Sequence, residues 1–235
     1  MCENFPGQTL EIIYRDQQLV AINKPHGLLV HTTHMAAGET ITAVRLLRNQ
    51  TGQWVFPAHR LDRKTAGVLL FSFDKSTNSL LQQQFMNHRV EKTYHAIVRG
   101  YTDETGTIDY PVAGKNGKPK EAITHYKTLQ RVELTLPFGK FNTSRYSMVE
   151  IMPVSGRIHQ IRKHFAHILH PIIGDRPHGC NKQNRLFLEK WNHYNMLLHA
   201  RCLRLMHPLN DCMIEITAGY QQSFLRIMEI MGMNV

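Results

Sequence analysis

Acidic side chains, cysteines and long apolar runs are all scarce in this chain of 235 residues. Its 18 aspartates and glutamates are outnumbered by 28 lysines and arginines, so the formal net charge is +10 at pH 7. A surface of that charge attracts polyanions, and RNA and DNA are the commonest of these. The charge alone leaves an anionic membrane surface open as well.

No stretch of the sequence approaches the roughly twenty apolar residues that cross a bilayer. The first ten residues, MCENFPGQTL, lack the basic and then apolar order of a signal peptide. The four cysteines show no paired spacing of a zinc site and suggest no disulfide framework. They are Cys2, Cys180, Cys202 and Cys212. We therefore expect a cytoplasmic protein with reduced thiols and no membrane contact.

Histidine, in contrast, is abundant, with 15 in the chain. Four of them fall within HQIRKHFAHILH: His159, His164, His167 and His170. A metal site needs converging ligands, and this segment has neither an HExxH pair nor a nearby carboxylate to complete a ligand shell. We expect neither a metal nor a cofactor, and we interpret the four histidines as partly exposed helix side chains that face phosphate.

The hydrophobic share of 42% is enough for a real core, and no repeat, low-complexity segment or Gly/Ser linker divides the chain. One domain over residues 1–235, with its core at about 11–219, is the simplest organisation. Apolar alternation and short apolar runs predict strands. Two are expected within residues 11–25, and one each at 67–73, 92–100, 146–154, 196–208 and 213–219.

Three segments have the spacing and caps of helices. The first follows residue 74 with Ser76 as N-cap, the second spans residues 155–170 with Ser155 as cap, and the third closes the chain at 221–231. Residues 170–185 read as a loop. The basic, glycine-rich segment GKNGKPK (114–120) suits phosphate contact, although a merely solvated surface is equally open.

One arginine lies on the apolar face of the second helix. Ile158, Ile161, Phe165 and Leu169 follow the three-four spacing of one stripe, and Arg162 shares it. A guanidinium keeps its charge, and an unpaired buried charge is strongly destabilising. The spacing therefore predicts an anionic partner for Arg162.

Asp62 is the candidate for this partner. It stands in AHRLDRKTAG as a lone acid among Arg60, Arg63 and Lys64, directly before a strand expected to be buried. Beside an arginine the carboxylate stays ionised and available for nucleophilic attack. A purely structural salt bridge between a strand end and a helix remains open on spacing alone.

AHRLDRKTAGVLLF (58–71) resembles the catalytic segment of the RluA family of pseudouridine synthases, usually written HRLDRxTSGxLLF. Three further blocks follow the family order: INKPHGLLVH (22–31), KTYHAIVRG (92–100) and SGRIHQIRKHFAHILHPIIGD (155–175). The four blocks together are highly specific. The resemblance implies an α+β fold, the pseudouridine synthase catalytic fold, whose mixed and mostly antiparallel sheet is flanked by helices and loops.

The resemblance also implies roles for single residues. Asp62 matches the catalytic aspartate, and Arg162 matches the arginine that pairs with it. Tyr94 matches the active-site tyrosine that lies against the target base and is a proposed base for the C5 proton. Arg60 matches the arginine that enters the RNA stack where the flipped nucleotide was. Ala66 departs from the family serine, which we expect to change local hydrogen bonding only.

Within the family the resemblance is greatest to the members that modify uridine 65 of the tRNA T arm, and residues 121–129 and 143–185 carry it. RNA, and among RNAs tRNA, is the expected partner, with no obligate protein partner. The chain begins too close to the first block to hold the separate N-terminal RNA-binding domain of many relatives. A ribosomal RNA target and a noncatalytic RNA-binding protein are the alternatives.

Overall fold

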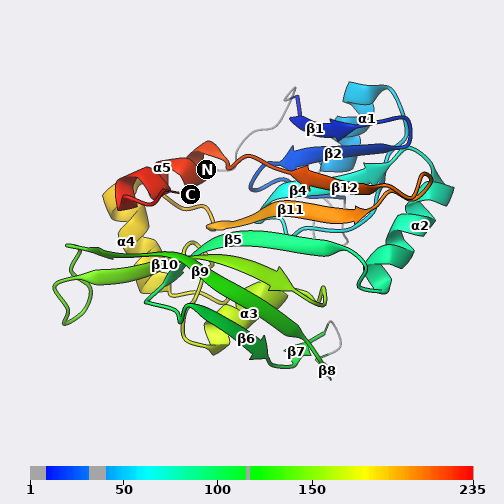
Figure 1. Cartoon of the computed structure of the whole chain (residues 1–235). Helices are drawn as coiled ribbons and strands as arrows, with labels where there is room; N and C mark the ends of the chain where they lie inside the picture. The colour runs from blue at the N-terminus through cyan, green and yellow to red at the C-terminus, as the bar shows by residue number, and fades with distance from the viewer. Residues whose placement is uncertain (1–8, 32–40, 115–116, 235) are drawn as a thin grey trace. The chain divides into compact units, whose positions relative to one another are not determined.

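The computed structural model describes residues 9–31, 41–114 and 117–234, and the chain forms two compact units (Figure 1). Residues 1–92 and 200–221 make the first unit, and residues 93–199 and 222–235 make the second. Each unit thus combines an early and a late part of the chain. The expectation of one domain stays a prediction. Within the described ranges no helix is long and apolar enough to span a bilayer.

The first unit is built on antiparallel strands. Its elements are β1 (Ile12–Arg15), β2 (Leu19–Lys24), α1 (Ala43–Thr51), β3 (Phe56–Pro57), β4 (Ala66–Ser72), α2 (Lys75–Met86), β11 (Leu198–Met206, from Ala200 on) and β12 (Met213–Thr217). β2 pairs with β1 and β4, β3 with β4, and β12 with β11. Every residue of β2 and β4 is buried, as expected of a strand that is apolar on both faces.

Alternate residues of these strands pack with α2 into one core. Leu19 and Leu70 contribute from the strands, Leu81 from α2 and Ile216 from β12, and all four are at most 2% exposed. Burying one such leucine contributes about 1.5–3 kcal/mol. This core holds β4 in place, and the HRLDR segment leads into the N-terminal end of that strand.

The start of α2 differs from the expectation. The N-cap is Asp74 and not Ser76: its Oδ1 accepts from the backbone N–H of Thr77 at 2.8 Å. The Ser76 hydroxyl lies within the first turn and donates to the same oxygen at 2.5 Å. The Asp74 carboxylate thus accepts from both the Thr77 backbone N–H and the Ser76 hydroxyl, whereas Ser76 only donates to Asp74.

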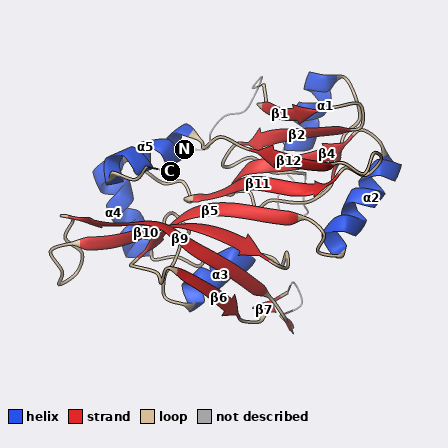
Figure 2. Ribbon diagram, viewed as in Figure 1, coloured by secondary structure: helices blue, strands red, loops and turns tan. Residues whose placement is uncertain are grey.

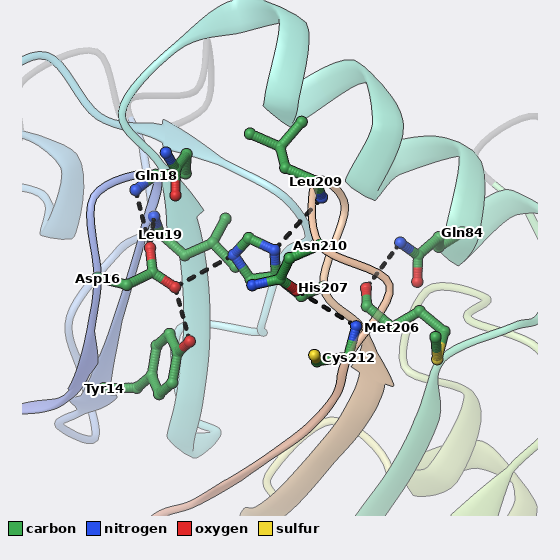
Figure 3. A network of polar contacts seen from close by, with 10 residues as sticks. All are labelled: Tyr14, Asp16, Gln18, Leu19, Gln84, Met206, His207, Leu209, Asn210 and Cys212. Atoms are coloured by element: carbon green, nitrogen blue, oxygen red, sulfur yellow. Dashed lines mark hydrogen bonds and ion pairs between the residues drawn. The ribbon is translucent and has the colours of Figure 1, made fainter.

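A polar network ties the β1–β2 turn to the end of β11 (Figure 3). Asp16 accepts from the Leu19 backbone N–H at 2.6 Å and from the Tyr14 hydroxyl at 2.6 Å, and its Oδ2 lies 3.2 Å from His207 Nε2. Since the Leu209 backbone N–H donates to His207 Nδ1, the proton of the neutral ring lies on Nε2 and points at Asp16. Burial, and then the bond to Asp16, raise the pKa of Tyr14 to about 12.

In the second unit, antiparallel strands are accompanied by helices (Figure 2). Its elements are β5 (Glu91–Arg99, from Thr93 on), β6 (Thr105–Asp109), β7 (Val112–Ala113), β8 (Pro119–Lys120), β9 (Ile123–Leu134), β10 (Ser144–Pro153), α3 (Gln160–His167), α4 (Asn181–Trp191) and α5 (Gln222–Met231). The sheet order is β5–β10–β9–β6. The expected strands and the closing helix are confirmed. Lys115 and Asn116 of the basic loop lie outside the described residues.

Two expectations in this unit are wrong. α3 begins at Gln160 and not at residue 155, because Ser155 donates its hydroxyl to the Gln160 side chain at 2.7 Å and His159 adopts a left-handed φ of 56°. Leu169 lies beyond α3 and is 81% exposed, so the apolar stripe is shorter than its spacing suggests. The loop expected at 170–185 contains the first turns of α4, whose Phe187 is buried.

Candidate active site

Asp62 lies in a tight turn immediately before β4. The backbone N–H of Thr65 donates to the Asp62 carbonyl oxygen at 3.0 Å, and the flanking Leu61 and Thr65 are both buried. The Asp62 side chain itself is half-buried. These buried neighbours anchor the turn that carries the Asp62 carboxylate.

A buried lysine secures this turn. Lys24, at the end of β2, is 0% exposed and donates its ammonium to the carbonyl oxygens of Pro25, Leu28 and Arg63 at 3.0, 2.9 and 3.1 Å. Three acceptors match the three N–H donors of the protonated group. The Gly27 N–H also donates to the Arg63 carbonyl at 2.9 Å. The INKPHG and HRLDR segments are therefore tied together through the main chain.

The charge of Lys24 is balanced between two effects. Burial lowers its pKa to about 7, and the negative charge of Asp62 opposes this shift. Unfolded lysine keeps its proton up to pH 10.5, so between about pH 7 and 10.5 the unfolded chain binds more protons. Stability attributable to this group therefore rises with pH across that window.

We expect the difference in free energy of unfolding between wild type and Lys24→Met to shift in favour of wild type from pH 7 to pH 10, by at most about 1.4 kcal/mol per pH unit. Denaturant titrations at several pH values measure it, because all other titrating groups are common to both proteins. Lys182→Met, at an exposed position, is the matched control. A difference that stays constant with pH would show that Lys24 keeps its proton throughout.

The histidine of HRLDR has a structural role. His59 accepts the Leu70 backbone N–H at Nε2 at 3.1 Å and stacks on Phe85 with ring centroids 4.8 Å apart. Burial, followed by the charge of Lys92, lowers its pKa to about 4. The ring is thus neutral near pH 7. The next residue, Arg60, is exposed, and its guanidinium has no hydrogen bond or ion pair with any described residue.

The residue after Ala66, Gly67, occupies a position that only glycine can fill. Its φ is +109°, and a Cβ at this position would lie 2.1 Å from the carbonyl oxygen of Ala200 in β11. Ala66, where the family pattern has serine, begins β4 and is buried. The start of β4 can thus approach β11 this closely only with glycine at residue 67.

Tyr94 and Arg162 lie in the second unit. Tyr94 stands in β5 opposite Ile151 of β10, is half-buried, and packs on the core that includes Ile161 and Phe165 of α3. Arg162 is 4% exposed, which confirms that it points inward. Asp62 and Arg60 belong to the first unit. The pairing of Asp62 with Arg162 therefore stays a prediction.

The structure gives Arg162 an acidic partner that the sequence analysis did not consider. Asp175 accepts from Arg162 Nε and Nη2, both at 2.8 Å, and the two side chains are 5% and 1% exposed. This bidentate geometry fixes the plane of the guanidinium. The sequence does contain a sign of this pair, because a buried arginine needs an acidic partner and Asp175 follows only 13 residues later. The prediction from sequence names Asp62 alone as the partner of Arg162.

The loop around Asp175 is held by the start of α4. Asn184 donates to the Asp175 carbonyl at 2.7 Å and accepts the Gly174 N–H at 2.8 Å. A Cβ at Gly174, whose φ is +81°, would lie 2.0 Å from the carbonyl oxygen of Asn195. The run GDRPHGCNKQN is therefore a support that orients Asp175, and through it Arg162.

The expectation for the four histidines is only partly correct. His164 is fully buried, and its Nε2 lies 2.9 Å from the Tyr110 carbonyl, so it cannot face phosphate. His167 is exposed and stacks on Tyr110 at 3.6 Å, while His159 contacts His178 at 2.9 Å. In the described ranges no three potential metal ligands come together. Of the cysteines, Cys180, Cys202 and Cys212 are free, and Cys2 lies outside those ranges.

Residues 18–167 match the family model described as RNA pseudouridylate synthase. The chain is 43% identical to tRNA pseudouridine synthase C of Vibrio cholerae and 45% identical to that of Haemophilus ducreyi, in each case over 95% of this chain and 96% of the relative. The solved structure of human RNA pseudouridylate synthase domain containing 4 aligns with a TM-score of 0.75 at 24% identity, over 96% of this chain and 94% of that one.

The structural likeness confirms the expected α+β pseudouridine synthase fold. The family match spans three of the four quoted blocks entirely and reaches into the fourth. The chain therefore belongs to the RNA pseudouridylate synthases, as a member of the RluA family, and is an isomerase that converts uridine to pseudouridine.

Proposed function

We propose that this enzyme isomerises uridine 65 in the T arm of tRNA, with Asp62 as its nucleophile. The enzyme acts in the cytoplasm, and its chain forms one catalytic domain. The main support for this proposal is the sequence identity of 41–45% to several tRNA pseudouridine synthases C over nearly the whole chain. The basic composition supports an RNA substrate, and its net charge of +10 favours phosphate binding.

The reaction breaks the bond between N1 and C1′, turns the base, and forms a bond between C5 and C1′. The base then loses the proton at C5, and N1 gains one, so the product is an isomer of the substrate. One carboxylate suffices, since no external leaving group needs protonation. Asp62 is assigned either to attack at C1′ or to elimination toward a glycal, and Tyr94 to the removal of the C5 proton.

The target nucleotide must leave its helix before this chemistry, which costs a few kcal/mol of stacking and pairing. Arg60 is suited to fill the gap, because the residue is exposed and its guanidinium has no hydrogen bond or ion pair with the described residues. Lys24 holds the Asp62 turn, and Asp175 orients Arg162. In this proposal Arg162 pairs with the Asp62 carboxylate.

The test uses unmodified tRNA transcripts carrying tritium at uridine C5. Wild type is expected to release close to one equivalent from one position, and primer extension after pseudouridine-specific labelling should place it at uridine 65. A transcript with cytidine at that position should release none. Release from another tRNA position would refute the site, and release from ribosomal RNA alone would refute the substrate class.

A further inference from the structure

The second unit contains a hollow at the end of β5 remote from Tyr94. Its volume is about 270 Å³, and its walls include Arg99, Arg145, Phe138 and Phe141. Along β5, Tyr94 pairs with Ile151 and Arg99 pairs with Tyr146. Five residues of strand separate the two positions, or roughly 17 Å. The hollow is therefore not the place where Tyr94 meets the target base.

The turn between β9 and β10 (Figure 1) contains two phenylalanines that line this hollow, Phe138 and Phe141. Phe138 and Phe141 exchange backbone hydrogen bonds at 2.9 and 3.2 Å across Gly139 and Lys140. Below the turn, Ser144 donates its hydroxyl to the Leu136 carbonyl at 2.7 Å, and both residues are buried. The turn thus has a fixed base.

These two rings are more exposed than phenylalanine rings that pack in a hydrophobic core. Phe141 is 60% exposed and Phe138 is half-buried. Each carries a cation near one face: Arg99 Cζ lies 5.4 Å from the Phe138 centroid, and Lys140 Nζ lies 5.6 Å from that of Phe141. The common alternative is a turn aromatic that merely shields the hairpin. Such a role requires neither the adjoining hollow nor the cations.

The charge of the hollow fits a phosphate. Arg99 is half-buried, and its Nη1 has a weak contact with Cys180 Sγ at 3.9 Å. The Arg145 side chain is 59% exposed, and its ion pair with Glu133 at 3.2 Å leaves further N–H donors for another acceptor. Adjacent exposed rings and cations are the combination that binds single nucleotides of RNA by stacking and phosphate contact.

We propose that this hollow binds a second nucleotide of the RNA substrate, with its base stacked on Phe141 and its phosphate on Arg99 and Arg145. The proposal depends on an RNA substrate but not on the modified position. Stacking on a phenylalanine accepts any base, so the contact adds affinity without sequence preference.

Binding of an unmodified tRNA transcript to Phe141→Ala, Phe141→Tyr and Arg145→Gln tests this. Phe141→Ala is expected to weaken binding about tenfold and raise KM similarly, with kcat at saturating RNA unchanged. Phe141→Tyr should restore affinity because it keeps the ring. Arg145→Gln should also weaken binding and reduce by about one the slope of log affinity against log salt.

The matched control is Leu169→Ala, which removes an apolar side chain of the same unit that is even more exposed, 81% against 60%, and it should bind as wild type does. Photocrosslinking of bound RNA should mark the peptide that contains residues 138–145. Unchanged affinity and KM in Phe141→Ala, or crosslinks confined to other peptides, would overturn the proposal. Because binding is read directly, the result stands even if the modified position is not uridine 65. If tRNA proves not to be the substrate, the same measurements on ribosomal RNA decide it.

Discussion

Asp62→Asn will lower turnover by about 10⁴-fold or more, while the affinity for tRNA stays within about twofold of wild type. The amide has the shape of the carboxylate but cannot act as a nucleophile. RNA affinity comes mainly from the basic surface, which this change leaves in place. Single-turnover tritium release and filter binding on the same tRNA measure the two quantities.

The control for this substitution is Asp211→Asn. Asp211 is an exposed acid of the same unit with a φ of 51°, which asparagine adopts readily. It should retain full turnover. Parallel losses of binding and activity in Asp62→Asn would indicate a structural salt bridge instead, and retained turnover would assign the chemistry to another group.

Asp175→Ala is expected to reduce the free energy of unfolding by about 3–5 kcal/mol, because it leaves the Arg162 guanidinium buried beside a lost partner. Urea titrations measure this change. The exposed pair between Arg185 and Glu189 supplies the control: its atoms are also 2.8 Å apart, yet Glu189→Gln should cost no more than about 1 kcal/mol. Equal effects at the two sites would contradict the importance of burial.

A double variant separates stability from catalysis at this site. Replacing both charges, as in Arg162→Met with Asp175→Leu, removes the pair without leaving a charge unpartnered, so much of the stability should return. If Arg162 pairs with Asp62 as proposed, tritium release should remain lost, because the double variant has no guanidinium at residue 162. Recovery of turnover together with stability would show that the pair only supports the fold.

The parts of the fold that depend on local periodicity were predictable. β2, β4 and β5 follow from their apolar runs, and the inward direction of Arg162 follows from its neighbours. The prediction for Arg162 was nevertheless correct for an incomplete reason, since Leu169 is exposed beyond the end of α3. The burial of Arg162 comes from the tertiary position of α3 on the sheet.

What could not be predicted depends on contacts between distant segments. Lys24 is a charged residue at a strand end, where solvent exposure is the usual outcome, and only the approach of the Asp62 turn encloses it. α4 was missed because NKQNR is polar and its start lacks a side-chain cap, although Gln183 and Phe187 are buried one turn apart. Asp175 was overlooked because one carboxylate already satisfied the requirement of Arg162.

The contacts of Lys24 have a consequence for how this site can evolve. All three of its acceptors are main-chain oxygens, so the side chains of Pro25, Leu28 and Arg63 can change without removing an acceptor. A single-residue insertion between Pro25 and Leu28, in contrast, would move a carbonyl by about 3 Å and break the arrangement. This part of the enzyme is therefore constrained in length far more than in the identity of the residues around the lysine.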